Sequence, residues 1–402
     1  ESKEIAEQIS SLDVIQQVIC SIPEQNRIFK KCAAFLLKSI GKHSVQLANL
    51  IIEADGLNAL KIIIEDTDPL VKEAGCWALT SLISQGPSLT STILETINVS
   101  VIMSCVKEPE FGLKRVAINC FTQIARQSDD LAKLIINKDI GLIQQLKILF
   151  TSKDTLLRRQ SLACLTQITS SKRDLVERVL ETINIEIIAN CLKDEDLPVK
   201  INATLLLRNI IRVSPDSSKQ AISFNCDETL INILNSSPDE AKDGILECLR
   251  IIASSSDNGS LRILNYKADS MALEILKSSK ISLLRQSCLR FIGTIYQNYA
   301  ESKKINNQSN IITILLEFFN ENSKSNNEFV EEFNKCFEQV LKCYKSAHIF
   351  INALGKTNNG VIKGVIIRRF SDVAHEFNEE KKEFVRLKGL EILWALKKTS
   401  TE

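Results

Sequence analysis

The residues of this chain that could carry out chemistry are few. None of its three histidines, His43, His348 and His375, has a Ser or Cys partner in a recognisable catalytic arrangement. The stretch Gly41-Lys42-His43-Ser44 ends like a phosphate-binding loop, but Leu36 stands where such a loop needs its first glycine. We interpret His43 as a hydrogen-bonding residue of a turn. The sequence therefore predicts that the protein is not an enzyme and binds no cofactor.

Twelve cysteines could form disulfide bonds or bind a metal ion, but their placement favours packing. No Cys-x-x-Cys pair occurs, so the spacing of a zinc site is absent. Six cysteines instead recur at two equivalent places of a repeated pattern, Cys120, Cys164 and Cys248 at one and Cys20, Cys105 and Cys191 at the other. Small thiols that fill packed interfaces in a reducing compartment explain this placement.

The repeated pattern is marked by a basic residue that returns every 42 to 44 positions. These residues, which we call the rungs, are Lys30, Lys72, Lys114, Arg158, Lys200, Lys242 and Arg285. Seven positions after each rung stands Leu, Ile or Phe, ten positions after it stands Ile or Leu, and three positions after it the residue is usually small. Offsets of 3, 7 and 10 share one face of an α-helix, so each rung begins a helix with one buried side.

Two further helices are expected before each rung helix. In the second repeat, Gly41 is a predicted helix C-cap, Ser44 a predicted N-cap and Gly56 a break between two apolar helices. Asp68 and Pro69 then suit the start of the rung helix. Three helices in about 42 residues predict an all-α armadillo-repeat solenoid with a right-handed superhelical course. Solenoids of this kind usually act as binding surfaces.

Composition excludes several classes of partner. The 402 residues include 50 basic and 49 acidic ones, which leaves no excess of positive charge for a nucleic acid. No apolar run approaches the roughly 18–20 residues that span a membrane. The chain begins at Glu1 without an initiator Met, and we expect it to be a fragment of a longer protein.

The rungs lie in the first turn of their helices, where the helix dipole disfavours a cation. Pairing with the acidic turn just upstream would offset this cost and form a solvated tie. Alternatively, the cations form a basic edge that meets an acidic filament surface. The candidate residues of this basic edge are Lys30, Lys72, Lys114, Arg115, Arg158, Arg159 and Lys200.

The third helix of an armadillo repeat lines its groove, chiefly at offsets five and nine from the rung. The candidate groove residues at these offsets are Ser39, Trp77, Ser81, Gln123, Gln167, Asn209 and Thr294. The Trp/Asn ladder with which nuclear-import adaptors hold basic peptides is absent, since Trp77, Asn119 and Asn209 at these offsets lie in three different repeats. The polar run at offset nine is consistent with recognition of an extended backbone or with a solvated face.

The repeats are expected to be least regular at the two ends of the chain. We predict an incomplete repeat over 1–27, regular repeats over 28–296, a degenerate repeat over 297–332 and degenerate capping repeats over 333–402. Residues 301–310 and 320–328 are predicted to be extended loops around an apolar run. Lys363 behaves as a late rung, and Trp394 lies on a predicted final helix.

Several motifs together narrow the resemblance within armadillo proteins. They are PEQNRIFKKCAAF at 23–35, GKHS at 41–44, DPLVKEA at 68–74 with WAL at 77–79, and EPE at 108–110 with LKR at 113–115. This pattern resembles the armadillo-repeat protein of the ciliary central pair, the family of sperm-associated antigen six and paralysed-flagella sixteen. The Lys-His-Ser turn of that family occurs once, at Lys42-His43-Ser44, so the chain resembles a diverged member.

The resemblance implies a structural scaffold of the ciliary or flagellar axoneme, associated with the C1 microtubule and required for central-pair stability and motility. It implies tubulin and other central-apparatus proteins as partners, and copies of the chain could also associate with each other. Neither a nucleic acid nor a membrane is expected as a partner. The alternatives are a scaffold elsewhere in the axoneme and a cargo or transport adaptor.

Overall fold

The structure is a computed structural model, and it describes residues 3–10, 13–137, 139–170, 172–256, 258–301, 311–322 and 327–399. In these ranges the secondary structure is entirely helical, with 27 α-helices, one 3-10 segment and no strand. The predicted all-α fold is therefore confirmed.

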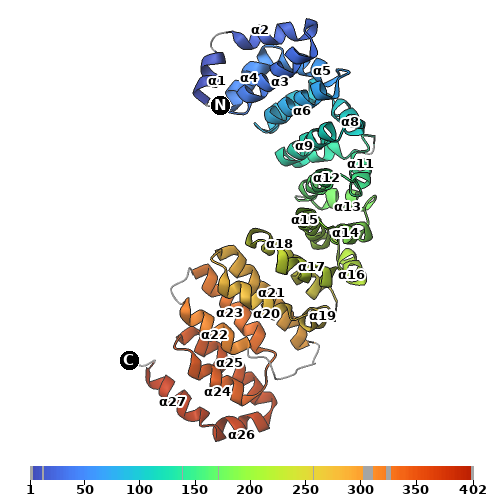
Figure 1. The fold of residues 1–402 in the computed structure, drawn as a ribbon. Coiled ribbons are helices and arrows are strands. Elements are labelled where there is room, and N and C mark those ends of the chain that lie inside the picture. The colour runs from blue at the N-terminus through green and yellow to red at the C-terminus, as the bar shows by residue number, and fades with distance from the viewer. Residues whose placement is uncertain are drawn as a thin grey trace. The chain divides into compact units, whose positions relative to one another are not determined.

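The chain divides into two compact units, Glu1–Val213 and Ser214–Glu402 (Figure 1). No predicted boundary lies there. The predicted boundary 296/297 lies inside α21 (Ser282–Glu301), and 332/333 lies inside α23 (Asn327–Leu341).

The first unit contains three-helix repeats in succession. Its elements are α1 (Lys3–Ser10), α2 (Val14–Ser21), η1 (Ile22–Glu24), α3 (Arg27–Gly41), α4 (Val45–Glu53), α5 (Gly56–Ile64), α6 (Pro69–Ile83), α7 (Pro87–Thr96), α8 (Val99–Lys107), α9 (Phe111–Gln127), α10 (Asp129–Ile135), α11 (Leu142–Leu149), α12 (Thr155–Ile168), α13 (Arg173–Leu180), α14 (Ile185–Cys191) and α15 (Leu197–Val213).

The second unit continues the pattern with longer and less regular helices. They are α16 (Pro215–Ser223), α17 (Cys226–Ser236), α18 (Asp239–Ser254), α19 (Gly259–Asn265), α20 (Ala268–Ser278), α21 (Ser282–Glu301), α22 (Ile311–Glu321), α23 (Asn327–Leu341), α24 (Ala347–Lys356), α25 (Gly360–Glu376), α26 (Asn378–Arg386) and α27 (Gly389–Thr399).

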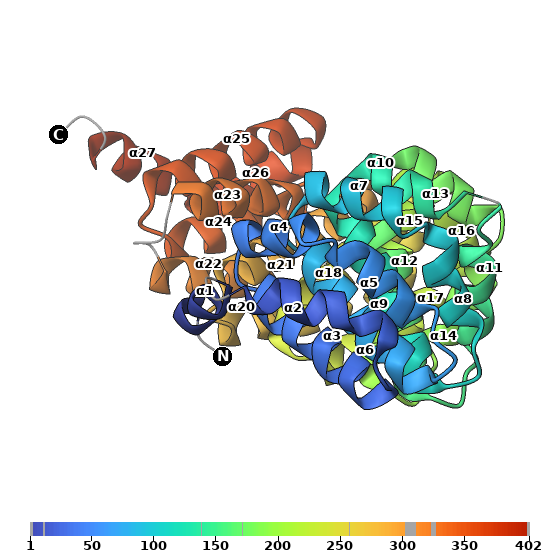
Figure 2. The ribbon, with the colours of Figure 1, turned by 90° about the horizontal axis from the view of Figure 1, so that it is seen from above.

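Within each unit, a rung helix packs on the next rung helix. In the first unit α3, α6, α9, α12 and α15 contact one another in that order, and the second helices α8, α11 and α14 lie on the other side of the stack (Figure 1). Figure 2 looks along this stack from its N-terminal repeat. In the second unit the same sequence of contacts joins α18, α21, α23 and α25.

The buried stripe predicted on the rung helices is confirmed at every repeat. All residues seven and ten positions after a rung, such as Leu37, Ile40, Leu207 and Ile210, are at most 1% exposed. Burying one such side chain stabilises the fold by roughly 1.5–3 kcal/mol, so the stripe is a main source of stability. The late rung Lys363 follows the same rule, since Phe370 and Val373 are buried on α25.

Local signals at the helix ends are partly confirmed. The Ser44 hydroxyl accepts from the amide of Leu47 at 3.2 Å, and the Asp68 carboxylate accepts from the amide of Leu70 at 2.8 Å. Gly41, in contrast, is not a left-handed C-cap. It is the last residue of α3, and an added Cβ would lie 2.5 Å from the Cδ2 atom of Leu82, so its small size serves close packing.

The predicted extended loops are wrong at their edges. Glu301 ends α21, Asn320 and Glu321 belong to α22, and Asn327 and Glu328 begin α23. Hydrogen bonding of the backbone and burial of the flanking apolar run outweigh the weak helix preference of Asn and Ser. Asn322 is a turn residue after α22, and the remaining positions, 302–310 and 323–326, lie outside the described residues. The apolar run between them forms α22, and the predicted final helix with Trp394 is α27.

Ten of the twelve cysteines are buried, which confirms packing for five of the six recurring ones, whereas Cys20 is exposed. Burial raises the pKa of the Cys164 thiol to about 12, so this thiol stays protonated and unreactive at neutral pH. Among the described helices, no single one is long and apolar enough to cross a membrane. One pair bent by 77°, α7 with α8, passes that test on length and composition.

Candidate protein-binding face

Most rungs of the first unit are ion-paired to the following repeat. The Lys30 ammonium lies 2.8 Å from the Asp66 carboxylate, and the Lys72 ammonium lies 2.5 Å from Glu108. Each acid stands 36 positions after its rung. The prediction that a rung pairs with the turn just upstream is therefore wrong for these two rungs, but it is confirmed for Lys242, whose ammonium lies 2.7 Å from the Asp239 carboxylate. Because the repeats stack, the turn that precedes each rung helix lies over the first turn of the rung helix one repeat earlier.

The third such pair is bidentate. The Nε and Nη2 atoms of Arg158 donate to the two carboxylate oxygens of Asp194 at 2.7 and 3.0 Å. Burial acts to raise the pKa of Asp194, but hydrogen bonds from Arg158 and from the Asp196 amide outweigh it, so the pKa lies below its usual value. The pKa of Asp66 is lowered in the same way: burial acts to raise it, but hydrogen bonds from the Asp68 amide and from Lys30 outweigh burial. Both carboxylates are therefore charged at neutral pH.

Five of the seven basic-edge candidates have an acidic partner inside the chain. Besides the three rungs above, Arg115 lies 3.8 Å from Asp154 and Arg159 lies 2.5 Å from Asp196. Lys114 and Lys200 are half-buried, and no carboxylate of the described residues lies within 4.0 Å of either. These pairs favour the structural tie, and binding of an acidic filament by this edge stays a prediction.

The candidate groove residues differ in accessibility. Ser39 is exposed, while Trp77, Ser81, Gln123, Gln167 and Thr294 are half-buried.

Asn209 is not available to a ligand because it is 6% exposed. Its side-chain amide donates to the Thr166 carbonyl at 3.0 Å and to the Thr169 hydroxyl at 3.2 Å, which ties α15 to α12. Sequence periodicity did not reveal this role, because it depends on the neighbouring repeat.

The solvent-facing side of the rung helices follows offsets 1, 5, 8 and 12, one helical stripe opposite the core. We call these positions in the five repeats of the first unit the third-helix face. They are Lys31, Phe35, Lys38, Lys42, Glu73, Trp77, Thr80, Ser84, Arg115, Asn119, Thr122, Arg126, Arg159, Ala163, Thr166, Ser170, Ile201, Leu205, Arg208 and Arg212. All of them reach solvent except Thr80.

Two aromatic side chains begin the centre line of this face. Phe35 on α3 is 44% exposed, and Trp77 follows on α6. The Lys38 ammonium lies 4.5 Å from the ring centroid of Trp77 and 5.8 Å from that of Phe35. Cation–π contacts of this kind hold the rings in place at the surface. An open aromatic pair beside a cation can accept an apolar side chain of a partner.

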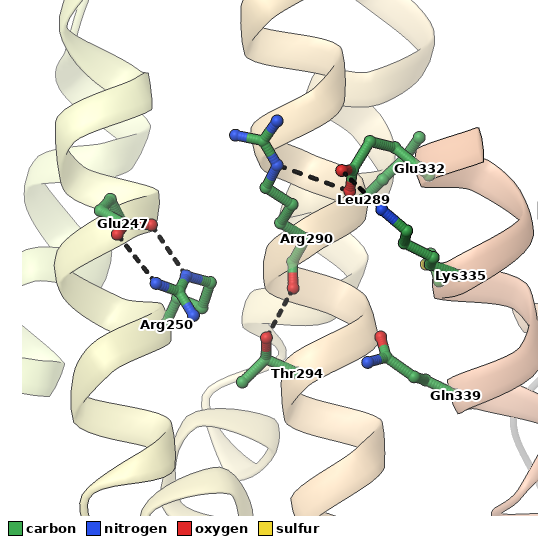
Figure 3. Close-up of a pocket in the computed structure, with 9 residues that line it drawn as sticks. Glu247, Arg250, Leu289, Arg290, Thr294, Glu332, Lys335 and Gln339 are labelled. Atoms are coloured by element: carbon green, nitrogen blue, oxygen red, sulfur yellow. Dashed lines mark hydrogen bonds and ion pairs between the residues drawn. The ribbon is translucent and has the colours of Figure 1, made fainter. Parts of the chain in front are cut away.

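The second unit has a hollow of 220 Å³ between α18, α21 and α23 (Figure 3). Its charges are largely paired within the chain. Arg250 donates to both carboxylate oxygens of Glu247, at 2.8 and 2.9 Å, and this hydrogen bonding raises the pKa of Arg250. Glu332 lies 3.5 Å from Arg290 and 3.6 Å from Lys335. The hollow is thus polar but close to neutral.

Comparison with known proteins defines the class of the fold. No family model and no curated protein matches the sequence. Among solved structures, an engineered protein superposes with a TM-score of 0.74 at 19% identity and covers 95% of this chain and 93% of its own. The designed armadillo repeat protein YIII(Dq)4CqI reaches a TM-score of 0.54 at 16% identity and covers 59% of this chain and 99% of its own.

A related design, YIII(Dq.V1)4CPAF, was solved in complex with the peptide (KR)4. It has a TM-score of 0.54 at 15% identity over 59% of this chain and 99% of its own. These likenesses establish the fold, which is an armadillo-repeat solenoid. Solenoids of this class are typically protein-binding scaffolds without catalytic activity.

Proposed function

We propose that the protein is a non-catalytic scaffold that holds an extended segment of a partner protein on the third-helix face. The observation that carries this proposal is the open Phe35–Trp77 pair on a face whose opposite side is entirely buried. The solved complex of a designed armadillo repeat protein with (KR)4 supports a peptide as the occupant of such a fold. The accessible polar side chains Ser39, Ser81, Gln123 and Gln167 can hydrogen-bond a peptide backbone.

Peptide selection tests this proposal. Random twelve-residue peptides displayed on phage are selected against the full chain, and the affinity of the selected peptides is measured for Trp77→Ala. We expect a loss of about tenfold or more, because a buried aromatic anchor contributes a large share of binding. Ile148→Ala is the control, since Ile148 is 61% exposed on the second helix α11. If no peptides are selected, or if both variants bind them alike, the proposal is wrong.

We further propose that this scaffold acts in the cilium or flagellum, in the central apparatus beside the C1 microtubule. The support is the resemblance carried in register by the motifs at 23–35, 41–44, 68–79 and 108–115. Tubulin and neighbouring central-apparatus proteins are the partners that this role requires. The rigid stack of repeats would join them and sustain central-pair stability and beating.

The position of a tagged chain in intact axonemes tests the cellular role. Cryo-electron tomography should place its density on the C1 member of the central pair. Density on the outer doublets would keep the scaffold but move it elsewhere in the axoneme. Absence from the axoneme would exclude the ciliary role and leave the second candidate, a cargo adaptor, which the same peptide-binding face favours.

A further inference from the structure

The rung helices of the first unit carry a charge that the whole chain does not. Helices α3, α6, α9, α12 and α15 contain thirteen basic residues and one acidic residue, Glu73. The whole chain is nearly balanced, with 50 basic and 49 acidic residues. The positive charge of the first unit is therefore concentrated on the helices that form the third-helix face.

Intramolecular pairing leaves about half of these cations without a carboxylate. Six of the thirteen have one within 4.0 Å, namely Arg27, Lys30, Lys72, Arg115, Arg158 and Arg159. Among the described residues no carboxylate lies that close to the other seven, which are Lys31, Lys38, Lys114, Arg126, Lys200, Arg208 and Arg212. Five of the seven, all except Lys114 and Lys200, lie on the third-helix face.

Arg208 supplies a second, independent observation. Its Nε atom is buried and has no hydrogen-bond partner in the described part of the chain. Its Nη2 atom donates only to the Asn209 side-chain oxygen at the long distance of 3.4 Å. Buried donors of a guanidinium are normally satisfied, and a carboxylate is the acceptor that fits their fork best. The guanidinium of Arg208, which reaches solvent in part, is thus only weakly satisfied within the described chain, and an incoming carboxylate can pair with its accessible nitrogens.

We propose that the third-helix face binds an acidic, extended polypeptide segment with an apolar residue near the end that contacts Phe35 and Trp77. This proposal rests on the proposed scaffold function and names the chemistry of its partner. Carboxylates of the segment pair with the unpaired cations, and its apolar residue packs between the two rings beside Lys38.

The geometry of the stack sets the spacing of such a segment. Stacked helices lie roughly 8–10 Å apart, and an extended chain rises about 3.3 Å per residue. Every third residue of the segment therefore reaches a new repeat. The unpaired cations of the third-helix face lie on α3, α9 and α15, which are two repeats apart, so an acidic residue at about every sixth position matches them.

A polypeptide fits this face better than a nucleic acid. Acidic residues that pair with the rungs, Asp66, Glu108 and Asp194, lie in the turns just before the rung helices α6, α9 and α15. They would repel a continuous line of phosphates but leave room for carboxylates at intervals. The aromatic pair at one end also favours a segment of mixed polarity.

The test compares two labelled peptides of equal length, (DE)4 and (KR)4, by fluorescence anisotropy with the full chain at low salt. We expect (DE)4 to bind at least about tenfold more tightly, and added salt to weaken its binding. A labelled dT12 strand tests the other polyanion. Tighter binding of (KR)4 or of dT12 than of (DE)4 would overturn the proposal.

Matched variants locate the binding site. The pair Arg208→Gln and Arg212→Gln should weaken (DE)4 by about tenfold or more, because it removes two cations of the third-helix face. The pair Arg173→Gln and Arg178→Gln removes the same charge from α13 and should change the affinity little. Equal losses in both pairs would mean that net charge alone attracts the peptide, which contradicts a built site.

Two further readouts keep the outcome decisive. If the Arg208 pair unfolds, Arg126→Gln replaces it, because Arg126 is an exposed cation of the third-helix face on α9. If phage selection yields peptides that bind through Trp77 but are not enriched in Asp and Glu, the scaffold function stands and the acidic partner is wrong.

Discussion

The two units use one repeat but join their repeats by different chemistry. In the first unit the rungs Lys30, Lys72 and Arg158 reach acids 36 positions later, in the next repeat. In the second unit Lys242 pairs with Asp239 of its own helix, and Arg285 meets the amide oxygen of Asn322 at 3.3 Å. The rung position is thus kept while its partner changes.

Aromatic packing is concentrated in the second unit. The rings of Phe319 and Phe333 have centroids 4.5 Å apart, and those of Phe370 and Phe384 are 4.0 Å apart. Hydrogen bonds between rung helices add to these contacts, as between Gln339 and Gln297 at 2.7 Å. An interface between solenoid repeats therefore needs complementary groups at a given position, but the type of interaction between these groups can differ.

The largest effect is expected from a charge in the shared core. Ile210→Asp in the first unit should lower the free energy of unfolding by roughly 3–5 kcal/mol, since it buries an unpaired carboxylate. Ile252→Asp should do the same in the second unit, because both residues are 0% exposed. Trp77 fluorescence reports urea unfolding of the first unit, and circular dichroism reports the loss of helix in both units. Ile210→Val is the control, and a small shift for either Asp variant would refute the shared repeat register.

The ion pairs between repeats should come next. Asp194→Asn removes the charged partner of Arg158, whose side chain is 16% exposed, and should cost about 1 kcal/mol after solvent screening. Asp239→Asn in the second unit should cost less, because its carboxylate is 38% exposed and its pair lies within one helix. Equal losses, measured by urea unfolding followed by circular dichroism, would erase the distinction between the units.

The pH dependence of the first unit follows from the lowered pKa values of Asp66, Asp194 and Asp196. A carboxyl group whose pKa is lower in the folded than in the unfolded state stabilises the fold above the unfolded value, about 3.9. This contribution is lost as the pH falls through the folded pKa.

We therefore expect the urea concentration at half-unfolding, reported by Trp77, to decrease as the pH is lowered below about 4. This decrease should be less steep when Asp66 and Asp194 are both changed to Asn. Unfolding measured at pH 7, 4.5 and 3 checks this expectation. A variant with an unchanged slope would show that the pairs between repeats do not control acid stability.

The smallest effects are expected at two glycines. Gly41→Ala in the first unit places a Cβ against Leu82 and should destabilise by about 1 kcal/mol. Gly364→Ala lies inside α25 of the second unit with no atom within 4 Å of the new Cβ, so it should stabilise by about 0.5–1 kcal/mol through helix propensity. A lower melting temperature for Gly41→Ala and a higher one for Gly364→Ala would support the packing described for each helix.

Periodicity predicted much of this fold, because the core positions of a repeat protein are set by residues that are close in the sequence. The stripe through Leu37 and Ile40, the caps at Ser44 and Asp68, and the late rung at Lys363 depend on residues within one helix or turn. The candidate site was harder to predict. Offset five correctly indicated the accessible Trp77, but Asn209 at offset nine is buried by its neighbour.

By itself the sequence determined the helices, their buried side and the basic character of the rung helices, since these are properties of residue type and spacing. Only the tertiary structure decided which acid meets each rung, where the chain divides into two units, and which cations remain unpaired. Such features depend on atoms about 36 to 44 residues apart that stacking brings within a few ångströms. A pattern confined to one helix carries no information about that distance.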